Sequence, residues 1–297
     1  MKAYKYLAFL FFISIPFLSC AQRNFDDITI ETTQLSDHIY MLVASGGNIG
    51  VSAGDDSVLV IDNQFAPLTP KILEALKKLS DKPVKIVMNT HHHRDHTGGN
   101  ENFGKLGSTI IAHDNVRKRL ENEQPKIALP IITFNDKLHL EINGEQVAVF
   151  HVENAHTDGD VMLYFTNSNV LHTGDTYFNG RFPYIDLSSG GSVNGYINAV
   201  KSGLMVVDEN TKIIPGHGNL SNKAEYESFL KMLQTLKTNV LEEIKKDKTE
   251  DDVANNESLT KTFDDLGYGI GFINSEKIRR TFYKSLKESF SNNQNTN

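Results

Sequence analysis

The residues best suited to chemistry in this sequence are histidines and aspartates gathered in one short segment. His91, His93, Asp95 and His96 closely follow the apolar segment 84–88, which is typical of a buried strand. In an extended turn alternate side chains point the same way, so the first two histidines project together while Asp95 and His96 can reach a second point nearby. Such crowding of polar groups is costly unless a divalent cation compensates it. Imidazole and carboxylate donors predict a zinc site, with iron and manganese as alternatives.

Three more residues of ligand type occur later in the chain. His156, Asp175 and His217 each come shortly after a predicted strand, and strand ends are where α/β proteins usually build their sites. Glycines adjoin Asp175 and His217, and they let the backbone turn sharply and approach a bound ion. Cys20 is the single cysteine, which excludes a thiolate metal cluster and an intramolecular disulfide.

The elements that must position these residues alternate between strands and helices. Short strands separated by Gly-rich turns are predicted from residue 28 to about residue 61. Further strands are predicted at 84–88, 108–112, 138–141, 146–152, 161–165, 169–172 and 212–215, and helices at 69–80, 98–106, 114–122, 193–207 and 221–246. Ile278, Phe282 and Leu286 predict a final helix. This order predicts an α/β domain with sheets inside and helices outside.

The two ends of the chain differ from the rest. Residues 1–21 combine two lysines, an apolar run and a small-residue patch, the pattern of an export signal. Cleavage fits after Ala21, or before Cys20, which would then carry a lipid. We therefore expect a protein exported to the periplasm or the extracellular space, touching a membrane only through such a lipid. Residues 25–290 are expected to form a single domain with a C-terminal helical extension, and 291–297 a disordered tail.

The net charge of the chain limits the kinds of molecule that it is expected to bind. The 297 residues have a formal net charge of −7, which argues against a mainly electrostatic nucleic-acid binder. We expect instead a monomer or weak dimer that acts on a small molecule.

The metal-ligand segments, in this order and with Val60-Ile61-Asp62 upstream, resemble the metallo-β-lactamase superfamily of binuclear metal hydrolases. The resemblance covers about residues 35–235. It implies a four-layer αβ/βα sandwich of two mixed β-sheets flanked by helices, with the metals in a cleft at one edge of the sheets.

The resemblance also assigns roles to individual residues. It implies a first metal held by His91, His93 and His156, a second held by Asp95, His96 and His217, and a bridge between the two formed by Asp175. Asp62 would not bind metal but would support the metal-bearing turn through hydrogen bonds.

Two zinc ions in such a centre would share a hydroxide that attacks an acyl bond, with Asp95 orienting it. Asp175, where the best-known zinc β-lactamases have cysteine, resembles the glyoxalase II and lactonase branches. An exported single domain without the extra helical domain of glyoxalase II resembles the β-lactamase-like group. We expect hydrolysis of a cyclic amide or ester, a β-lactam or a lactone. The alternatives are a thioester or phosphodiester hydrolase, a mononuclear iron persulfide dioxygenase, and a non-enzymatic metal-storing or adhesive surface protein.

Substrate contacts are predicted directly after Asp175. Tyr177, Phe178, Asn179 and Arg181 are candidates, because aromatic side chains can bury an apolar acyl group and an arginine can pair with a carboxylate. The turn at 45–48 is either a flap over the cleft or an ordinary hairpin turn.

Overall fold

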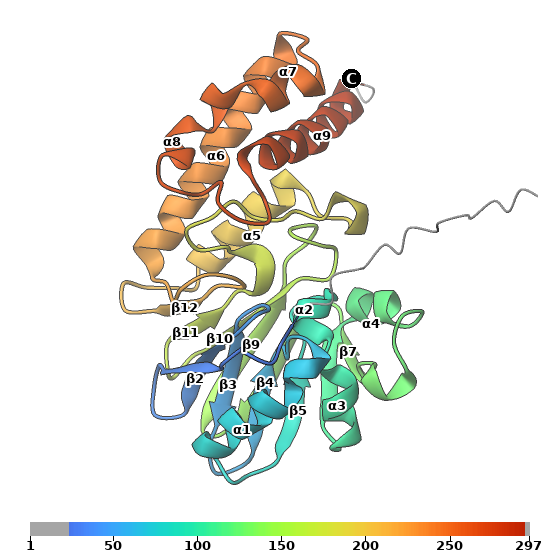
Figure 1. The fold of residues 1–297 in the computed structure, drawn as a ribbon, viewed down its shortest axis with the longest axis vertical. Helices are drawn as coiled ribbons and strands as arrows, with labels where there is room; N and C mark the ends of the chain where they lie inside the picture. Colours follow the sequence, from blue (N-terminus) through green and yellow to red (C-terminus); the bar gives the residue numbers. More distant parts are fainter. Residues whose placement is uncertain (1–23, 295–297) are drawn as a thin grey trace, which may run out of the picture.

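The computed structural model describes residues 24–294, so the predicted export signal at 1–21 lies outside the described residues. Two β-sheets pack face to face, and helices cover the outer face of each (Figure 1). The architecture is the four-layer sandwich of two mixed sheets that the sequence predicted.

The first sheet contains seven strands in chain order. They are β1 (Glu31–Gln34), β2 (Ile39–Val43), β3 (Ile49–Ala53), β4 (Val58–Ile61), β5 (Val84–Met88), β6 (Thr109–His113) and β7 (Ile132–Phe134). Strands β1 to β4 pair antiparallel and β4 to β7 pair parallel. Parallel neighbours need a crossover connection, and the helices between these strands supply it.

The second sheet has the order β12-β11-β10-β9-β8. Its strands are β8 (Lys137–Ile142), β9 (Glu145–His151), β10 (Val161–Phe165), β11 (Val170–His172) and β12 (Lys212–Ile214). Only the β11–β12 pair among these is parallel, because α5 connects the two strands.

Strand β4 shows why the layers form. Leu59 and Ile61 lie in the apolar core between the sheets, while Val58 and Val60 pack with Ile72 of the covering helix. Alternate side chains of a strand point to opposite faces, so a strand covered on both faces needs apolar residues throughout.

Helices cover both outer faces. The first sheet is flanked by α1 (Thr69–Leu79), α2 (Arg94–Thr97), α3 (Asn100–Lys105) and α4 (Asp114–Leu120), and the second by α5 (Val193–Leu204) and α6 (Lys223–Lys245). Short 3-10 helices lie at η1 (Ala66–Leu68), η2 (Lys126–Ala128), η3 (Gly174–Thr176), η4 (Leu187–Ser189) and η5 (Glu257–Leu259). Val200 and Leu233 pack with Leu171 and Ile213 in one apolar cluster, which joins α5 and α6 to the second sheet.

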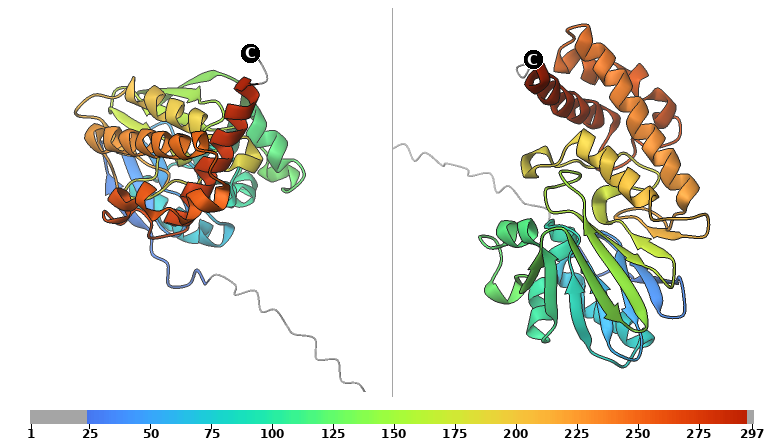
Figure 2. Two further views of the ribbon diagram at one scale, coloured as in Figure 1. Left: turned by 90° about the horizontal axis from the view of Figure 1, so that it is seen from above. Right: turned by 180° about the vertical axis from the view of Figure 1, so that it is seen from behind.

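The last helices gather with α6 at one end of the molecule (Figure 2). They are α7 (Glu250–Asn255), α8 (Lys261–Asp264) and α9 (Ser275–Gln294), and the residues that predicted a final helix are buried in α9. The expected disordered tail at 291–297 is corrected in part, since α9 continues to Gln294 through a segment without glycine or proline. Within residues 24–294, no helix is both long and apolar enough to cross a membrane.

The helix predicted at 98–106 forms as α3, whereas the short helix α2, which ends at Thr97, was not predicted. Gly98 and Gly99 separate them. The Gly99 N–H donates to Asn63 Oδ1 at 2.8 Å, so the backbone turns toward β4 at this point. The edge strand β7 was not predicted, and its residues are exposed or only partly buried.

Candidate metal centre

Seven histidine and aspartate side chains meet at one edge of the two sheets. The first sheet supplies four of them from the segment after β5, and the second sheet supplies three from the segments after β9, β11 and β12. The first four are His91, His93, Asp95 and His96, and the other three are His156, Asp175 and His217. Residues far apart in the sequence converge because these strands end at the same edge of the sandwich.

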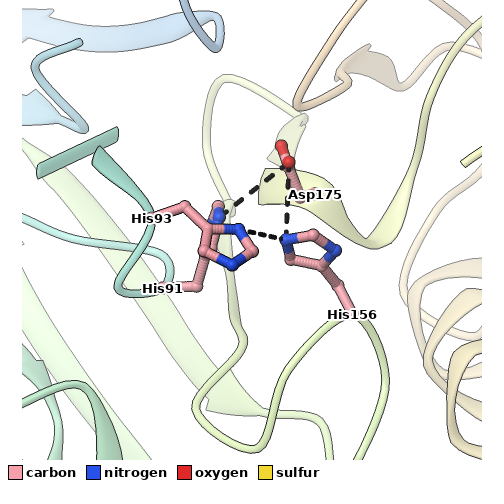
Figure 3. A group of neighbouring side chains, drawn as sticks. All are labelled: His91, His93, His156 and Asp175. Carbon is pink, nitrogen blue, oxygen red and sulfur yellow. Dashed lines mark hydrogen bonds and ion pairs between the residues drawn. The ribbon is translucent and has the colours of Figure 1, made fainter. Parts of the chain in front are cut away.

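The first donor group contains His91, His93 and His156 beside Asp175 (Figure 3). His93 Nδ1 lies 2.8 Å from His156 Nε2. Asp175 Oδ2 lies 3.9 Å from His91 Nε2 and 3.6 Å from His156 Nε2. One donor atom from each of the four residues lies within 4.8 Å of all the others, which is the convergence that a bound cation requires.

The second donor group contains Asp95, His96 and His217. Asp95 Oδ2 lies 3.4 Å from His217 Nε2 and 3.9 Å from His96 Nε2. Asp175 faces this group too, because its Oδ1 is 3.0 Å from His96 Nε2 and its Oδ2 is 3.4 Å from His217 Nε2. The carboxylate of Asp175 therefore lies between the two groups, at the place that the family resemblance gives to a bridge.

Buried atoms without hydrogen-bond partners test whether these residues fit a metal. His91 Nε2, His96 Nε2 and Asp175 Oδ1 are buried and make no hydrogen bond within the described residues, although the last two are in close contact. Leaving such atoms unsatisfied costs free energy, and a cation would satisfy all three. The donor set fits metal binding, and the role of each residue as a ligand stays a prediction.

Asp62 holds His96 in place. Asp62 Oδ2 lies 2.7 Å from His96 Nδ1, and the Asp62 carboxylate accepts hydrogen bonds from the N–H and the Oγ1–H of Thr90. Contacts of this kind are what the family resemblance implies for Asp62, and its role in supporting a bound metal stays a prediction. The residue has a φ of 62°, a strained conformation that surrounding contacts must maintain.

Two further supports were not predicted from the sequence. The His156 Nδ1–H donates to the Tyr184 carbonyl at 2.8 Å, which directs Nε2 toward the centre. His93 Nε2 lies 3.1 Å from Asp186 Oδ2. A backbone carbonyl carries no sequence signal, and Asp186 lies far from every metal-ligand motif, so neither contact could be found by spacing.

The two donor groups differ in charge when no metal is present. Burial lowers the pKa of His91 well below its ordinary value and that of His156 to about 4. Burial also opposes charge on His96 and His217, but the neighbouring Asp175 carboxylate raises the pKa of His96 well above its ordinary value and that of His217 to about 9. At neutral pH His91 and His156 are therefore neutral, whereas His96 and His217 carry imidazolium charge beside carboxylates.

Two glycines let the backbone approach the centre closely. A Cβ atom on Gly47 would lie 2.1 Å from His96 Cε1, and one on Gly216 would lie 2.1 Å from Asp175 Oδ1. Asn48 Nδ2 donates to the Pro215 carbonyl at 2.8 Å, and the Asn48 N–H donates to the Gly216 carbonyl at 2.7 Å. Of the two interpretations of the turn at 45–48, these contacts favour a fixed turn over a flap.

A pocket of about 530 Å³ opens onto the centre. Its lining combines charged residues of the centre with apolar side chains from several elements. The apolar members are Phe65, Phe178, Phe182, Tyr184, Ile270, Phe272 and Ile273, and the polar members outside the centre are Ser45, Arg94 and Arg181.

Two of the four predicted substrate contacts are corrected. Phe178 and Arg181 line the pocket, but Tyr177 and Asn179 do not. Tyr177 is buried with its hydroxyl 2.8 Å from Ser221 Oγ, and Asn179 Nδ2 donates to the Asn219 carbonyl and to a carboxylate of α6. The backbone is extended at Tyr177, so neighbouring side chains point to opposite sides.

The comparison with known families decides the identity of the fold. The model of the metallo-beta-lactamase superfamily matches residues 42–238. The chain belongs to this superfamily. It is a metallo-hydrolase of a superfamily that binds metal ions, and α7, α8 and α9 lie after the matched region.

Curated relatives are similar over part of their length. The hydroxyacylglutathione hydrolase of Pelagibacter ubique is 33% identical over 148 residues, which cover 48% of this chain and 56% of that protein. A probable hydroxyacylglutathione hydrolase of Schizosaccharomyces pombe is 30% identical over 170 residues, or 56% of this chain and 60% of that protein. The chain thus spans less than two-thirds of either relative.

Solved structures of metallo-β-lactamases share the fold. The metallo-β-lactamase from Pontibacter korlensis superposes with a TM-score of 0.62 at 18% identity, covering 69% of this chain and 99% of that one. The DIM-1 metallo-β-lactamase gives a TM-score of 0.60 at 17% identity, covering 70% and 99%.

Proposed function

We propose that this chain uses two metal ions, zinc by preference, to hydrolyse an acyl bond in a small cyclic ester or amide. The observation that carries the proposal is the position of Asp175, whose carboxylate faces both donor groups beside a pocket lined by aromatic side chains. Histidine and aspartate donors without thiolate suit zinc.

A pair of such ions supplies positive charge that polarises the scissile carbonyl and makes a water molecule more acidic. Asp95 is the residue placed to orient that water. Its side chain is partly exposed and lines the pocket. Burial opposes its charge, but the neighbouring His96 lowers the pKa of Asp95 to about 2, so it remains a carboxylate and accepts a hydrogen bond at neutral pH.

Arg94 and Arg181 favour a substrate that carries a carboxylate. Both line the pocket and are exposed, and within residues 24–288 neither forms an ion pair with an acidic side chain. An unpaired guanidinium at the mouth of a pocket matches a carboxylate by charge and by geometry. Ring-opened amides and esters also produce a carboxylate at the centre itself.

A thioester is the second candidate. The curated relatives named above are hydroxyacylglutathione hydrolases, which favours that bond type for this chain. The C-terminal helices also change one argument, because the loop before α9 lines the pocket. A helical extension that reaches the pocket removes one reason for preferring the β-lactamase-like group, namely that the chain lacks the extra helical domain of glyoxalase II.

The test combines metal analysis with a substrate panel. We would purify the chain from Gln22 onward, measure metals by elemental analysis, and assay a chromogenic cephalosporin, γ-butyrolactone, S-lactoylglutathione and bis-p-nitrophenyl phosphate. About two zinc ions per chain with opening of either cyclic substrate are expected. One iron per chain without hydrolysis would favour the dioxygenase, and metal binding without any turnover would favour a non-enzymatic role.

We also propose that the chain is exported, because residues 1–21 have the pattern of a signal peptide. Expression of the full chain followed by cell fractionation tests this, with Cys20→Ala as the variant that cannot be lipidated. An intracellular product that retains residues 1–21 would contradict export.

A further inference from the structure

The loop that joins α8 to α9, residues 265–274, borders the pocket although it lies outside the matched family region. Ile270, Phe272 and Ile273 from this α8–α9 loop line the same pocket as Asp175. The loop therefore faces any molecule that reaches the centre.

Several contacts hold the α8–α9 loop beside the pocket. The Phe182 N–H donates to the Tyr268 carbonyl at 3.2 Å, and the two rings lie 5.7 Å apart. Lys277 Nζ donates to the Phe272 carbonyl at 3.0 Å. One contact comes from the segment between η3 and η4 and the other from α9, so the loop is held beside the pocket at two points.

One aromatic ring lies between Phe272 and the centre. The edge of Phe272 meets Tyr184, with ring centroids 5.6 Å apart and planes at 85°. Tyr184 in turn stacks on His93, with centroids 5.7 Å apart and planes at 26°. An apolar group attached near an acyl carbon at the centre can therefore extend along Tyr184 to Phe272.

The side chains of Ile270 and Phe272 are largely exposed to solvent, although Lys277 Nζ lies over the Phe272 ring, 5.0 Å from its centroid. Ile270 is 81% exposed and Phe272 is 73% exposed, whereas Ile273 in the same loop is 8% exposed. Apolar surface beside a concave polar centre gains free energy when an apolar part of a ligand covers it. Leu266, which is 70% exposed in the same loop, does not line the pocket.

We propose that Ile270 and Phe272 bind an extended alkyl group of the substrate and select alkyl-substituted cyclic esters over unsubstituted ones. This inference rests on the proposed hydrolysis of an acyl bond and adds the substrate class, an amphiphile with the scissile bond at its polar end. The exposed positions tolerate truncation, so the fold of the variants is expected to persist.

The experiment compares γ-lactones that carry no substituent, a butyl chain or a hexyl chain. For the unmodified protein kcat/KM is expected to rise two- to fourfold for each added methylene that is buried, about 0.8 kcal/mol per methylene. Ile270→Ala and Phe272→Ala should each lower the hexyl-to-unsubstituted ratio of kcat/KM about tenfold. Leu266→Ala is the matched control and should keep that ratio.

Binding of butanoate, hexanoate and octanoate by calorimetry separates the two proposals. Turnover that does not depend on chain length, or a Leu266→Ala effect equal to that of Phe272→Ala, overturns the role of the loop. If neither the lactones nor the chromogenic cephalosporin is hydrolysed, the proposed function fails, and binding of the alkanoates then tests the alkyl site alone. Affinity that rises with chain length and is lost in Phe272→Ala supports the alkyl site, and equal affinities overturn it.

Discussion

The two donor groups of the centre share Asp175 but are supported in different ways. In the first, His156 donates to a backbone carbonyl, Thr90 Oγ1 contacts His91, and the carboxylate of Asp186 contacts His93. The second group depends on carboxylates, with the buried Asp62 holding His96. Burial keeps His91 and His156 neutral, while neighbouring carboxylates keep His96 and His217 protonated. Histidines of two neighbouring donor groups can therefore respond to protons in opposite ways.

Removal of Asp175, which both donor groups share, is expected to have the largest effect. Asp175→Ala is expected to lower activity by more than about a hundredfold and to deplete the second metal position, because the donors of both groups lose their common anion. Metal content, activity and circular dichroism would be measured on the same preparation. Retention of both metals with full turnover in a folded variant contradicts the bridging role.

Removal of Asp62 or Asp186, the acids that contact His96 and His93, tests each donor group separately. Asp62→Ala should weaken the second metal position about 10- to 100-fold, because His96 loses the contact that orients it. Asp186→Ala, the matched variant on the other side, should weaken the first position by a smaller factor, since His93 keeps its neighbours. Titration with cobalt followed by absorption spectroscopy distinguishes the positions. Equal effects of Asp62→Ala and Asp186→Ala on both metal positions would contradict the proposed difference between the two donor groups.

The two donor groups should also differ in how their metal affinity depends on pH. The pKa of His217 is raised to about 9 and that of His156 is lowered to about 4, so protons compete with metal at His217 below about pH 9 but hardly at His156 above pH 6. Affinity at the second position should fall about tenfold per pH unit for each displaced proton between pH 9 and 6. Calorimetry in buffers of different ionisation enthalpy counts those protons. A flat profile at both positions refutes the assignment.

The stability of the metal-free chain should change with pH in the opposite direction to the metal affinity. A raised histidine pKa stabilises the folded state fully below the unfolded value near 6.5, and this contribution is lost as the pH rises to about 9. Chemical denaturation of chelated protein at pH 6 and pH 9 should therefore show greater stability at pH 6.

The smallest expected effect lies at the mouth of the pocket. Arg181→Ala should raise KM for a carboxylate-bearing substrate about two- to fivefold and leave kcat nearly unchanged, because an exposed ion pair contributes at most about 1 kcal/mol. The effect should shrink at high salt, and a substrate without a carboxylate serves as the control. A change in kcat alone would point to a different role.

The sequence was informative where chemistry and spacing coincide. His91, His93, Asp95 and His96 lie within one turn after a strand, so their convergence could be predicted without tertiary information. The direction of Tyr177 could not, because an aromatic residue has the same pattern whether it faces a core or a pocket. The layered α/β order followed from the alternation of elements and the four-layer sandwich from the family resemblance, whereas the α8–α9 loop reaches the pocket through packing of α9 on α6 and α7, which local periodicity does not encode.

The distribution of donors between the sheets has a mechanical consequence. Each donor group takes side chains from segments after both sheets, so neither half of the sandwich can complete a metal position alone. Bound metal would link the two halves of the sandwich, and its binding free energy would add to the free energy that holds the two sheets together. Metal binding would then show that the two halves have packed together. Chelation should weaken the contact between the two sheets first.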